Sequence, residues 1–361
     1  MSYIQSIKLK NYRNYKSLDL SLNPNVNIFY GDNAQGKTNI LEAIFLAGTT
    51  KSHRGSKDRD IIQFGQEEAH IELHLLKEDI PYRIDMHLKK NKVKGIAINR
   101  VPIAKASELI GLMQVVFFSP EDLHIIKAGP IYRRRFMDLE LSQLNRVYLD
   151  ALSTYFRILK QRNLLLKDFH TLSDDLLDTW DEQLIQYGNK IIKIRHDFIN
   201  KVNKIIQPIH FNLTHETENI ELIYEDNLQG LSLEEALKKN RQRDLRLKNT
   251  TVGPHRDDFC VLINGMDVRQ FGSQGQQRTV ALSLKLSEIT LIRETVRHSP
   301  ILLLDDVLSE LDKQRQVQLL DYIQDIQTLI TCTGLDEFVN MRLHVDRTIK
   351  VKQGQVTVRV T

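Results

Sequence analysis

The sequence has few of the features that mark secreted or membrane-spanning proteins. It contains two cysteines, Cys260 and Cys332, both within apolar segments. We therefore expect two free thiols in a reducing compartment rather than a disulfide framework. Residues 1–16 lack the apolar core of a signal peptide, and no apolar run approaches the roughly 20 residues that cross a bilayer. These absences predict a cytoplasmic protein without membrane segments.

A strong excess of one charge is absent as well. The chain has 50 Lys and Arg against 46 Asp and Glu, a formal net charge of +4 with a pI near 8.8. This mild excess permits nucleic-acid binding but does not by itself indicate it. Hydrophobic residues make up 41% and charged residues 27% of the chain, which is typical of a globular protein. A length of 361 residues favours two lobes.

Proline is absent between Pro130 and Pro208, where the sequence is helical in pattern. Two sets of apolar residues recur with a period near 3.5, which predicts an antiparallel helical pair resembling a short coiled coil. Each helix would be about 45 Å long at about 1.5 Å per residue, and residues 168–175 predict the turn. The pair could project as an arm or pack in a globular bundle. The two sets are Met137, Leu141, Leu144, Tyr148, Leu152, Tyr155 and Leu159, and Trp180, Leu184, Tyr187, Ile191, Ile194, Phe198 and Ile205.

Outside this insert, strand and helix patterns alternate, which predicts an α/β fold. Residues 4–30 predict three strands, the last of them apolar and central in a sheet. Residues 69–103 predict an antiparallel β-meander with tight turns at residues 78–79 and 99–100. Further strands are predicted at 115–118, 220–224, 259–263, 301–305 and 328–332, helices at 232–247, 275–297 and 312–323, and a terminal hairpin around Gly354.

One glycine-rich segment carries a phosphate-binding pattern. "GDNAQGKT" matches G-x-x-x-x-G-K-[ST] and stands between an apolar strand and a helix, the context that gives the pattern meaning. Backbone N–H groups and the positive helix end would face the phosphates of a nucleotide. Lys37 would reach the β- and γ-phosphates, and the Thr38 hydroxyl would bind Mg²⁺. The predicted loop consists of Gly31, Asp32, Asn33, Ala34, Gln35, Gly36, Lys37 and Thr38.

Two adjacent carboxylates follow an apolar strand in "ILLLDD". Open α/β sheets bind ligands at the carboxyl ends of their strands. Neighbouring carboxylates at such a position repel each other and are poorly solvated, so a cation explains them. We predict that Asp305 is a direct partner of Mg²⁺ or binds it through a water, and that Asp306 holds the attacking water as general base or orients it. A helix cap is the alternative interpretation.

A third segment, "FGSQGQQRT", precedes a long helical pattern. Ser273 is a good N-cap residue, so a simple helix cap explains the segment when it is taken alone. A hydroxyl and free N–H groups at a helix N-terminus also form an anion site. Because the chain already has one phosphate loop, a second anion site predicts a nucleotide bound by another copy of the chain.

The order of these motifs resembles the ATP-binding-cassette (ABC) ATPases of the chromosome-maintenance type, and more narrowly the RecF family. The matching segments include "IKLKNYRNYKSLDL", "FFSPEDLHIIKAGPIYRRRFMDLEL", "TTVGPHRDDF" and "LLLDDVLSELD". The resemblance implies an ABC-type head with an antiparallel β-meander, split by the helical insert. The expected divisions are 1–125 and 248–361 for the ATPase domain and 126–247 for the helical arm.

The resemblance also implies function. RecF-like proteins bind ATP with Mg²⁺, form an ATP-dependent homodimer, and hold gapped, single-stranded or junction DNA. They hydrolyse ATP slowly, are stimulated by DNA, and act in the nucleoid with RecO and RecR to load RecA. Alternatives are another chromosome-maintenance head, a transporter ATPase subunit or a P-loop kinase. Implied nucleotide contacts are Arg13 and, from the opposite subunit, Ser273, Gln274, Gly275, Gln276 and Gln277.

Some positions depart from the wider ABC pattern. Asp306 stands where glutamate is usual, and the shorter side chain is consistent with weak hydrolysis. After strand 328–332, Thr331 and Thr333 occupy the region where transporters have a switch histidine. Gln114 is a candidate for the glutamine loop by location alone.

Candidate DNA contacts are harder to choose. Basic residues cluster at 89–94, 133–135 and 238–248, and each cluster could either neutralise phosphates or be a solvated face. The segment "GPHRDD", residues 253–258, is either part of a functional face or a salt-bridged turn.

Overall fold

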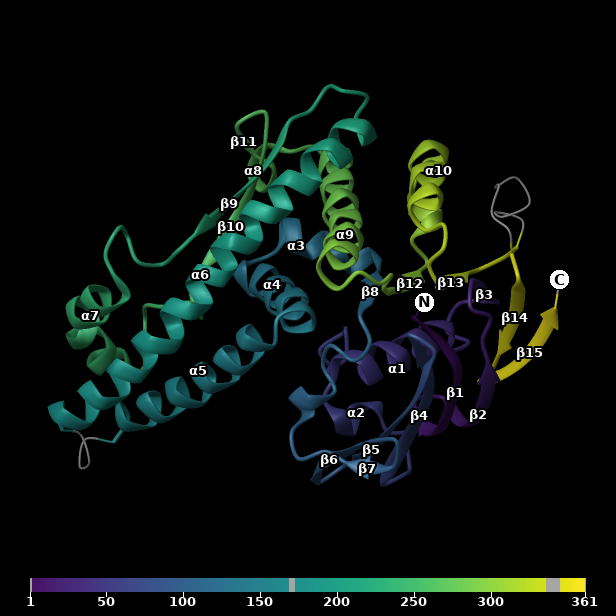
Figure 1. Ribbon diagram of the computed structural model, residues 1–361, viewed down its shortest axis with the longest axis horizontal. Helices are drawn as coiled ribbons and strands as arrows, with labels where there is room; N and C mark the ends of the chain where they lie inside the picture. Colours follow the sequence, from purple (N-terminus) through teal and green to yellow (C-terminus); the bar gives the residue numbers. More distant parts are fainter. Residues whose placement is uncertain (1, 169–172, 336–344, 361) are drawn as a thin grey trace. The chain divides into compact units, whose positions relative to one another are not determined.

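The computed structural model describes residues 2–168, 173–335 and 345–360. The chain forms two compact units, residues 1–122 with 288–361 and residues 123–287. Figure 1 shows both units and the labels of their elements. The α/β class and the split by a helical insert agree with the prediction.

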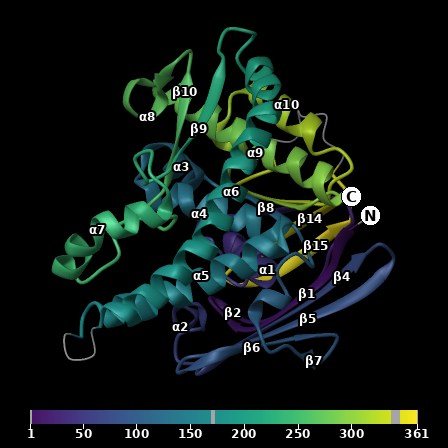
Figure 2. The same ribbon diagram turned by 60° about the vertical axis from the view of Figure 1, so that its left-hand side comes forward.

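The first unit contains a six-stranded antiparallel sheet in the order β2-β1-β4-β5-β6-β7. The predicted meander forms β4 (Glu68–Lys77), β5 (Ile80–Lys89), β6 (Lys92–Ile98) and β7 (Val101–Pro102). Both predicted turns are confirmed: Glu78, Asp79, Asn99 and Arg100 all have positive φ, as two-residue hairpins require. The N-terminal strands β1 (Ser2–Tyr12) and β2 (Tyr15–Ser21) extend this sheet (Figure 2).

A second six-stranded sheet, β15-β14-β3-β13-β12-β8, holds the apolar strands. Strand β3 (Val26–Tyr30) lies inside it, as predicted, parallel to β13 (Thr328–Cys332) and β14 (Arg347–Lys352). Strand β12 (Ile301–Asp305) is parallel to β13 and to β8 (Val115–Phe118). The terminal hairpin of β14 and β15 (Gln355–Val360) closes one edge. This order brings the end of β3 near the end of β12.

Helix α1 (Lys37–Thr49) follows β3 directly and contacts strands of both sheets. Nearly all its residues are buried, the charged Lys37 and Glu42 among them. It therefore joins the two sheets into one core. The other helices of this unit are α2 (Asp58–Ile61), η1 (Ala106–Glu108), η2 (Pro120–Asp122), η3 (Leu308–Glu310) and α10 (Lys313–Tyr322).

The second unit contains the predicted helical insert, but the first predicted helix is broken. Helix α4 (Pro130–Leu144) ends at Asn145, whose side chain caps α5 (Arg146–Leu165) by accepting a hydrogen bond from Tyr148 N–H. Helix α6 (Asp174–Leu213) is one piece and passes through Pro208. At about 1.5 Å per residue, α5 is about 30 Å and α6 about 60 Å long, so the two equal lengths of about 45 Å were wrong. Part of the predicted turn lies outside the described residues.

Helices α5 and α6 pack side by side (Figures 1 and 2) with a seam of mixed polarity. The buried positions of α6 alternate at spacings of three and four residues, as in a coiled coil, yet Asp181, Gly188 and Arg195 are among them. Arg162 of α5 donates to Asp181 at 2.5 Å, and Arg195 donates to Tyr148 at 2.9 Å. The apolar pattern alone could not predict this polar interior.

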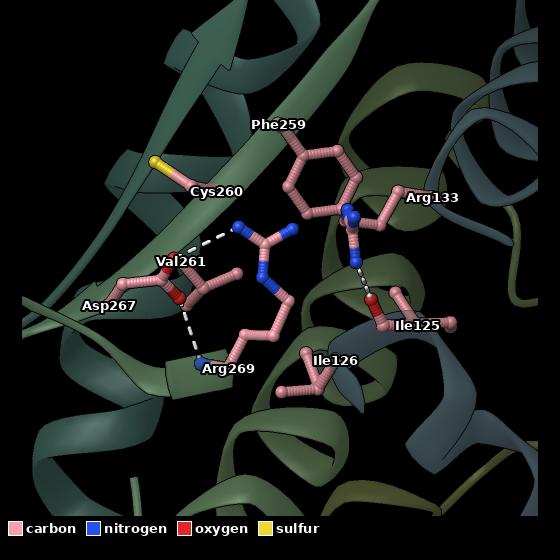
Figure 3. Close-up of a pocket in the computed structure, with 8 residues that line it drawn as sticks. All are labelled: Ile125, Ile126, Arg133, Phe259, Cys260, Val261, Asp267 and Arg269. Carbon is pink, nitrogen blue, oxygen red and sulfur yellow. Dashed lines mark hydrogen bonds and ion pairs between the residues drawn. The ribbon is translucent and has the colours of Figure 1, made fainter. Parts of the chain in front are cut away.

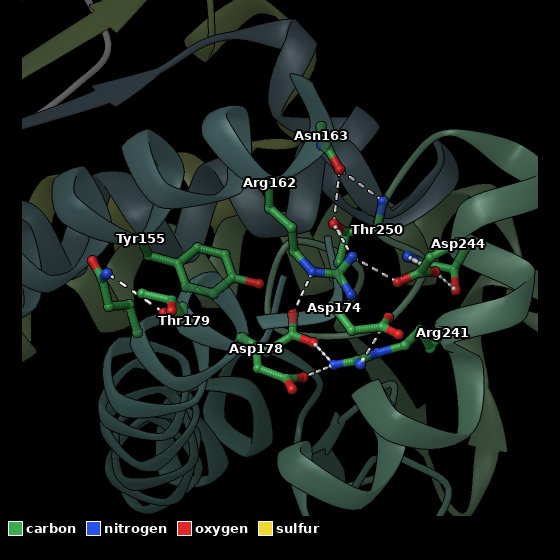
Figure 4. A network of polar contacts seen from close by, with 12 residues as sticks. Tyr155, Arg162, Asn163, Asp174, Asp178, Thr179, Arg241, Asp244 and Thr250 are labelled. Carbon is green, nitrogen blue, oxygen red and sulfur yellow. Dashed lines mark hydrogen bonds and ion pairs between the residues drawn. The ribbon is translucent and has the colours of Figure 1, made fainter. Parts of the chain in front are cut away.

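The interior charges are matched by further partners (Figure 4). Arg162, which is fully buried, also donates to Asp244 of α7 (Leu233–Leu247) at 2.8 Å. Because α6 contacts α4, α5, α7 and β9, the globular-bundle alternative describes the helical pair better than a free arm. Separating the partners of a buried ion pair costs about 3–5 kcal/mol, so we expect this network to disfavour other registers of α5 against α6.

The second unit ends later in the chain than the expected boundary at residues 247–248. Strands β9 (Ile220–Glu225), β10 (Asp258–Ile263) and β11 (Met266–Asp267) form their own three-stranded sheet. This sheet packs on α4 and α6 rather than joining the parallel sheet, and the division falls within α9 (Gln274–Val296). Short helices α3 (Leu123–Lys127) and α8 (Val268–Phe271) complete the unit.

Both cysteines are free thiols. Burial raises the pKa of Cys260 to about 12. Within residues 2–168, 173–335 and 345–360, no helix has the combined length and apolar character of a membrane span.

Candidate nucleotide site

The predicted phosphate loop joins β3 to α1 in the first unit. Gly31 and Gly36 have φ of 147° and 112°, a region that L side chains rarely adopt. A Cβ on Gly31 would come within 2.3 Å of Val351 O, and one on Gly36 within 2.4 Å of Asn14 Nδ2. Glycine is therefore required at both positions by conformation and by space.

Neighbouring segments brace this loop from outside. Asn14 Nδ2 donates to Gln35 O at 2.9 Å, and Tyr15 OH donates to Gly36 O at 3.0 Å. From the terminal hairpin, Gln353 N–H donates to Gln35 Oε1 at 2.7 Å. The loop pattern contains no signal for these braces, because they come from residues far apart in the sequence.

Lys37 is almost fully buried at the start of α1. Its Nζ donates to Gly31 O at 2.6 Å and to Asp32 O at 3.0 Å. The ammonium group thus lies inside the loop that would surround the phosphates, which is where the predicted role needs it.

Thr38 and Asp305 are brought together although 267 residues separate them. Thr38 Oγ1 donates to Asp305 Oδ1 at 2.7 Å, and Thr331 Oγ1 donates to the same oxygen at 2.8 Å. Burial raises the pKa of Asp305, with a smaller rise from the charge of Asp306, while the two hydroxyl groups oppose these effects. The ionised carboxylate is therefore short of compensating positive charge.

The donor set fits Mg²⁺. Mg²⁺ prefers oxygen ligands and usually takes only one or two from the protein, with the rest from phosphates and water. A hydroxyl and a carboxylate in contact meet this requirement. No group of three or more His, Cys, Asp or Glu side chains suited to a metal occurs among the described residues. These residues therefore do not support a metal site whose ligands all come from such side chains.

Asp306 has a left-handed backbone with φ of 52°. Such a conformation is uncommon for residues other than glycine and often marks a functional position. Its N–H donates to Thr331 Oγ1 at 3.0 Å, and its carbonyl accepts from Ser309 Oγ at 2.8 Å. Thr331 thus contacts the carboxylate of Asp305 and the backbone of Asp306, whereas Thr333 follows β13.

Arg13 is engaged by other residues of its own chain. It makes two hydrogen bonds to the buried Glu42 of α1, at 2.8 and 2.7 Å, and donates to Ser56 Oγ at 2.9 Å. Burial raises the pKa of Glu42, but hydrogen bonds from Arg13 and Ser52 and nearby positive charge outweigh it, so the pKa is lowered overall. Direct contact of Arg13 with a nucleotide stays a prediction.

Gln114 does not lie where a glutamine loop would be needed. It precedes β8, and its backbone carbonyl accepts from Ile301 N–H at the start of β12. Strands β8 and β12 are parallel, so Gln114 is at the end of the sheet opposite Asp305. The interpretation of Gln114 as the glutamine loop was wrong.

Arg54 is a cation near this site that the sequence analysis did not consider. It is exposed in the segment between α1 and α2, and its charge lowers the pKa of Asp305. An arginine in a loop carries no pattern of its own, which is why it was overlooked.

The predicted signature segment begins α9 in the second unit. Ser273 Oγ accepts from Gln276 N–H at 3.2 Å, and Gln276 Oε1 accepts from Ser273 N–H at 2.8 Å. This reciprocal pair is a capping box. Ser273, Gln274 and Gly275 are exposed, and a Cβ on Gly275 would meet nothing closer than Ser273 Oγ at 3.9 Å. The face beside Gly275 is thus open to a ligand.

A chain of polar contacts leads from this segment to the end of α6. Gln276 Nε2 donates to Glu218 Oε1 at 2.9 Å. Glu218 Oε2 lies 3.1 Å from Nε2 of the fully buried His210, whose Nδ1 lies 2.9 Å from Ser283 Oγ. Both the oxygen and the nitrogen of the Gln276 side-chain amide thus form hydrogen bonds within the chain. Direct contact of Gln276 with a nucleotide stays a prediction. Gln277 Nε2 donates to Val268 O.

We expect Glu218→Gln to weaken ATP-driven pairing of the chains by about three- to tenfold while leaving ATP affinity of the monomer unchanged. The substitution preserves shape but replaces a charged acceptor, whose hydrogen bonds are worth about 1.5–3 kcal/mol. Sedimentation with a non-hydrolysed ATP analogue measures pairing, and Glu216→Gln in the same loop is the control. Equal behaviour of the two variants would contradict the positioning role of Glu218.

Two of the basic clusters are largely neutralised by the protein itself. In the cluster 89–94, Lys90 pairs with Glu67 and Lys94 with Asp58. In the cluster 133–135, the buried Arg133 donates to Asp258 and points toward Ile125 (Figure 3). These charges support the fold.

The segment 253–258 supports the interpretation as a salt-bridged turn. His255 Nδ1 lies 2.8 Å from Tyr155 OH, and burial lowers the pKa of His255 to about 4. Asp258 holds Arg133, and Asp257 accepts from Asn227 N–H at 2.9 Å. These contacts lie inside the second unit, which explains the polar residues without a ligand.

Comparison with known proteins decides the family. The family model described as "RecF/RecN/SMC N terminal domain" matches residues 3–358. The "DNA replication and repair protein RecF" of Agathobacter rectalis is 57% identical over 98% of this chain and 99% of its own length. The chain belongs to the RecF family. The protein of the same name from Lachnospira eligens is 56% identical, over 98% of both chains.

Solved structures agree with this assignment. A structure described as "the recombination mediator protein RecF-ATP in RecFOR pathway" is 36% identical and has a TM-score of 0.93 over 99% of this chain and 98% of that chain. An Smc head domain from Pyrococcus furiosus has a TM-score of 0.59 at 16% identity, over 100% of this chain and 96% of that chain. This second likeness concerns the fold alone. The resemblance to the RecF family and the ABC-type fold class are both confirmed.

Proposed function

We propose that this chain is an ATP-dependent DNA-binding recombination mediator in replication and repair. Two copies would close on ATP, hold DNA at a gap or single-strand–duplex junction, and open after slow, DNA-stimulated hydrolysis. The observation that supports this proposal most directly is the hydrogen bond from Thr38 to Asp305, because it joins the phosphate loop to the carboxylate pair. The structure of a 36% identical RecF described with ATP supports the nucleotide.

Each residue has a separate task in the proposed reaction. Lys37 and the N–H groups at the start of α1 bind the phosphates, and Thr38 and Asp305 hold Mg²⁺. When bound, Mg²⁺ neutralises charge on the β- and γ-phosphate oxygens. Asp306 accepts a proton from the attacking water or orients it. Exposed Arg54 is a further candidate for phosphate contact.

Pairing supplies the second half of the site. The exposed hydroxyl of Ser273 and the N–H groups that begin α9 form an anion site that would meet the γ-phosphate held by the other copy. Asp312, which caps α10 by accepting from Arg315 N–H at 3.0 Å, belongs to the "SELD" segment that would cross the interface. RecO and RecR, and indirectly RecA, are the proposed protein partners, and the proposed location is the nucleoid in the cytoplasm.

Pairing gives a direct test. With a non-hydrolysed ATP analogue and Mg²⁺, we expect wild-type protein to sediment as a dimer at micromolar concentration, and Ser273→Arg to bind nucleotide within about threefold of wild type yet remain monomeric. Because Ser273→Arg also removes the N-cap of α9, we add Ser273→Asp as a second variant. Aspartate is a good N-cap residue, but its negative charge repels phosphate. Both should fail to pair, whereas Ser17→Arg on the exposed part of β2 should pair normally.

Two results would contradict this proposal. A wild-type protein that stays monomeric with the analogue would remove the two-copy site. A loss of nucleotide affinity in monomeric Ser273→Asp would mean that the segment serves the nucleotide of its own chain.

A further inference from the structure

The cations of helix α7 fall into two groups that the sequence does not distinguish. Lys238 pairs with Glu234 at 2.7 Å, and Arg241 pairs with Asp178 and Asp181 of α6. Figure 4 shows Arg241 turned toward Asp178, close to the network of Arg162 and Asp244. These two side chains are therefore committed to the fold.

The remaining cations form a stripe. Lys239, Arg243 and Arg246 follow one another at spacings of four and three residues, which places them on one face of the helix. All three are exposed. Among the residues that the structure describes, no carboxylate pairs with any of them. We name this set the α7 basic face.

Two of these cations line a cavity of about 160 Å³. A water molecule takes about 30 Å³ in the liquid, so the cavity has room for a tetrahedral anion. Asn227, Asn240 and Thr251 line the same cavity. Asn227 Oδ1 is buried and has no hydrogen-bond partner among the residues that the structure describes.

The cations of the α7 basic face favour an anionic partner. Like charges four residues apart on a helix repel each other, and no carboxylate of the described residues lies within ion-pair distance of Lys239 or Arg243. The stripe spans about 10 Å at about 1.5 Å per residue. Phosphates follow one DNA strand at a rise of about 3.4 Å, so the face can meet two or three of them.

We propose that the α7 basic face binds the phosphodiester backbone of DNA, with Lys239 and Arg243 holding one phosphate at the cavity and Arg246 contacting the next. This site rests on the proposed DNA-binding function. No aromatic side chain lines the cavity, so we infer contact with the backbone rather than with bases.

The test compares two triple variants of equal charge change. The first is Lys239→Ala with Arg243→Ala and Arg246→Ala. The control is Lys238→Ala with Lys89→Ala and Lys90→Ala, whose cations already pair with Glu234, Glu68 and Glu67. The affinity for gapped duplex DNA is measured against salt concentration with the ATP analogue present. ATP-driven pairing and thermal unfolding are recorded for both.

We expect the first variant to lose at least tenfold in DNA affinity at 100 mM salt. Its slope of log affinity against log salt should fall by about two, since two phosphate contacts are lost and each contributes about 0.9 in duplex DNA. The control should keep the wild-type slope, and both variants should pair normally with the ATP analogue.

Failure of the site and failure of the function are distinguishable. If wild-type protein binds DNA and the first variant has the same slope and affinity as the control, the site is wrong, and an acidic protein becomes the occupant to test. If wild-type protein pairs with the ATP analogue yet binds no DNA, the proposed function itself is overturned, and this site with it.

Discussion

Lys37→Ala should lower ATP affinity by about 30-fold to several thousandfold. Removing one partner of a buried, hydrogen-bonded charge pair costs about 2–5 kcal/mol, and each 1.4 kcal/mol is about tenfold in affinity. Lys37 is nearly fully buried, and its Nζ donates to two loop carbonyls, Gly31 O and Asp32 O. Its charge is therefore held in place before the phosphates arrive.

Calorimetric titration with ATP and Mg²⁺ measures this loss directly. Lys51→Ala, exposed just beyond the other end of α1, is the matched control and should bind as wild type. ATP-driven pairing and retention of DNA should disappear in Lys37→Ala. An affinity within threefold of wild type, in a variant with unchanged thermal unfolding, would refute the role of this lysine.

Asp306→Asn should lower the rate of ATP hydrolysis by about 10²- to 10⁴-fold, the usual contribution of a general base. Asparagine is nearly the same shape and tolerates a left-handed backbone, so the φ of 52° and the N–H contact with Thr331 should persist. ATP affinity should stay within about threefold. The paired state should accumulate, because hydrolysis no longer opens it.

Single-turnover hydrolysis and sedimentation with ATP measure these two effects. Asp305→Asn is the informative companion, since it removes the proposed Mg²⁺ ligand and should weaken Mg²⁺-dependent ATP binding as well. Turnover in Asp306→Asn within tenfold of wild type would exclude Asp306 as the base.

The phosphate loop and the carboxylate pair were predictable because their chemistry is local. Gly31 to Thr38 need particular backbone conformations, and only certain residue types allow them. Ile301 to Asp305 combine four apolar residues and an acid, a pattern that favours a cation site at the end of a buried strand. The tight turns of the meander were predictable for the same reason.

Arg13, Gln114 and the helical insert show where local reasoning stops. The partner of Arg13 is Glu42, 29 residues away, and no pattern in either segment names the other. Gln114 was a candidate by location alone, and the pairing of β8 with β12 places it at the end of the sheet opposite Asp305. The burial of Arg162 and Arg195 in the insert could not be predicted from the period of its apolar residues, because that period carries no information about the charged residues between them.

The sequence by itself determined the family, the fold class, the loop and the carboxylates, since each depends on residue types at short spacing. Only the tertiary structure decided which charged side chains already form ion pairs within the protein. Lys238 and Lys239 are neighbours of the same type, yet Lys238 pairs with Glu234 and Lys239 lines a cavity. That difference arises from helix geometry, which turns successive side chains about 100° apart, and from the acids that the fold brings to one side alone.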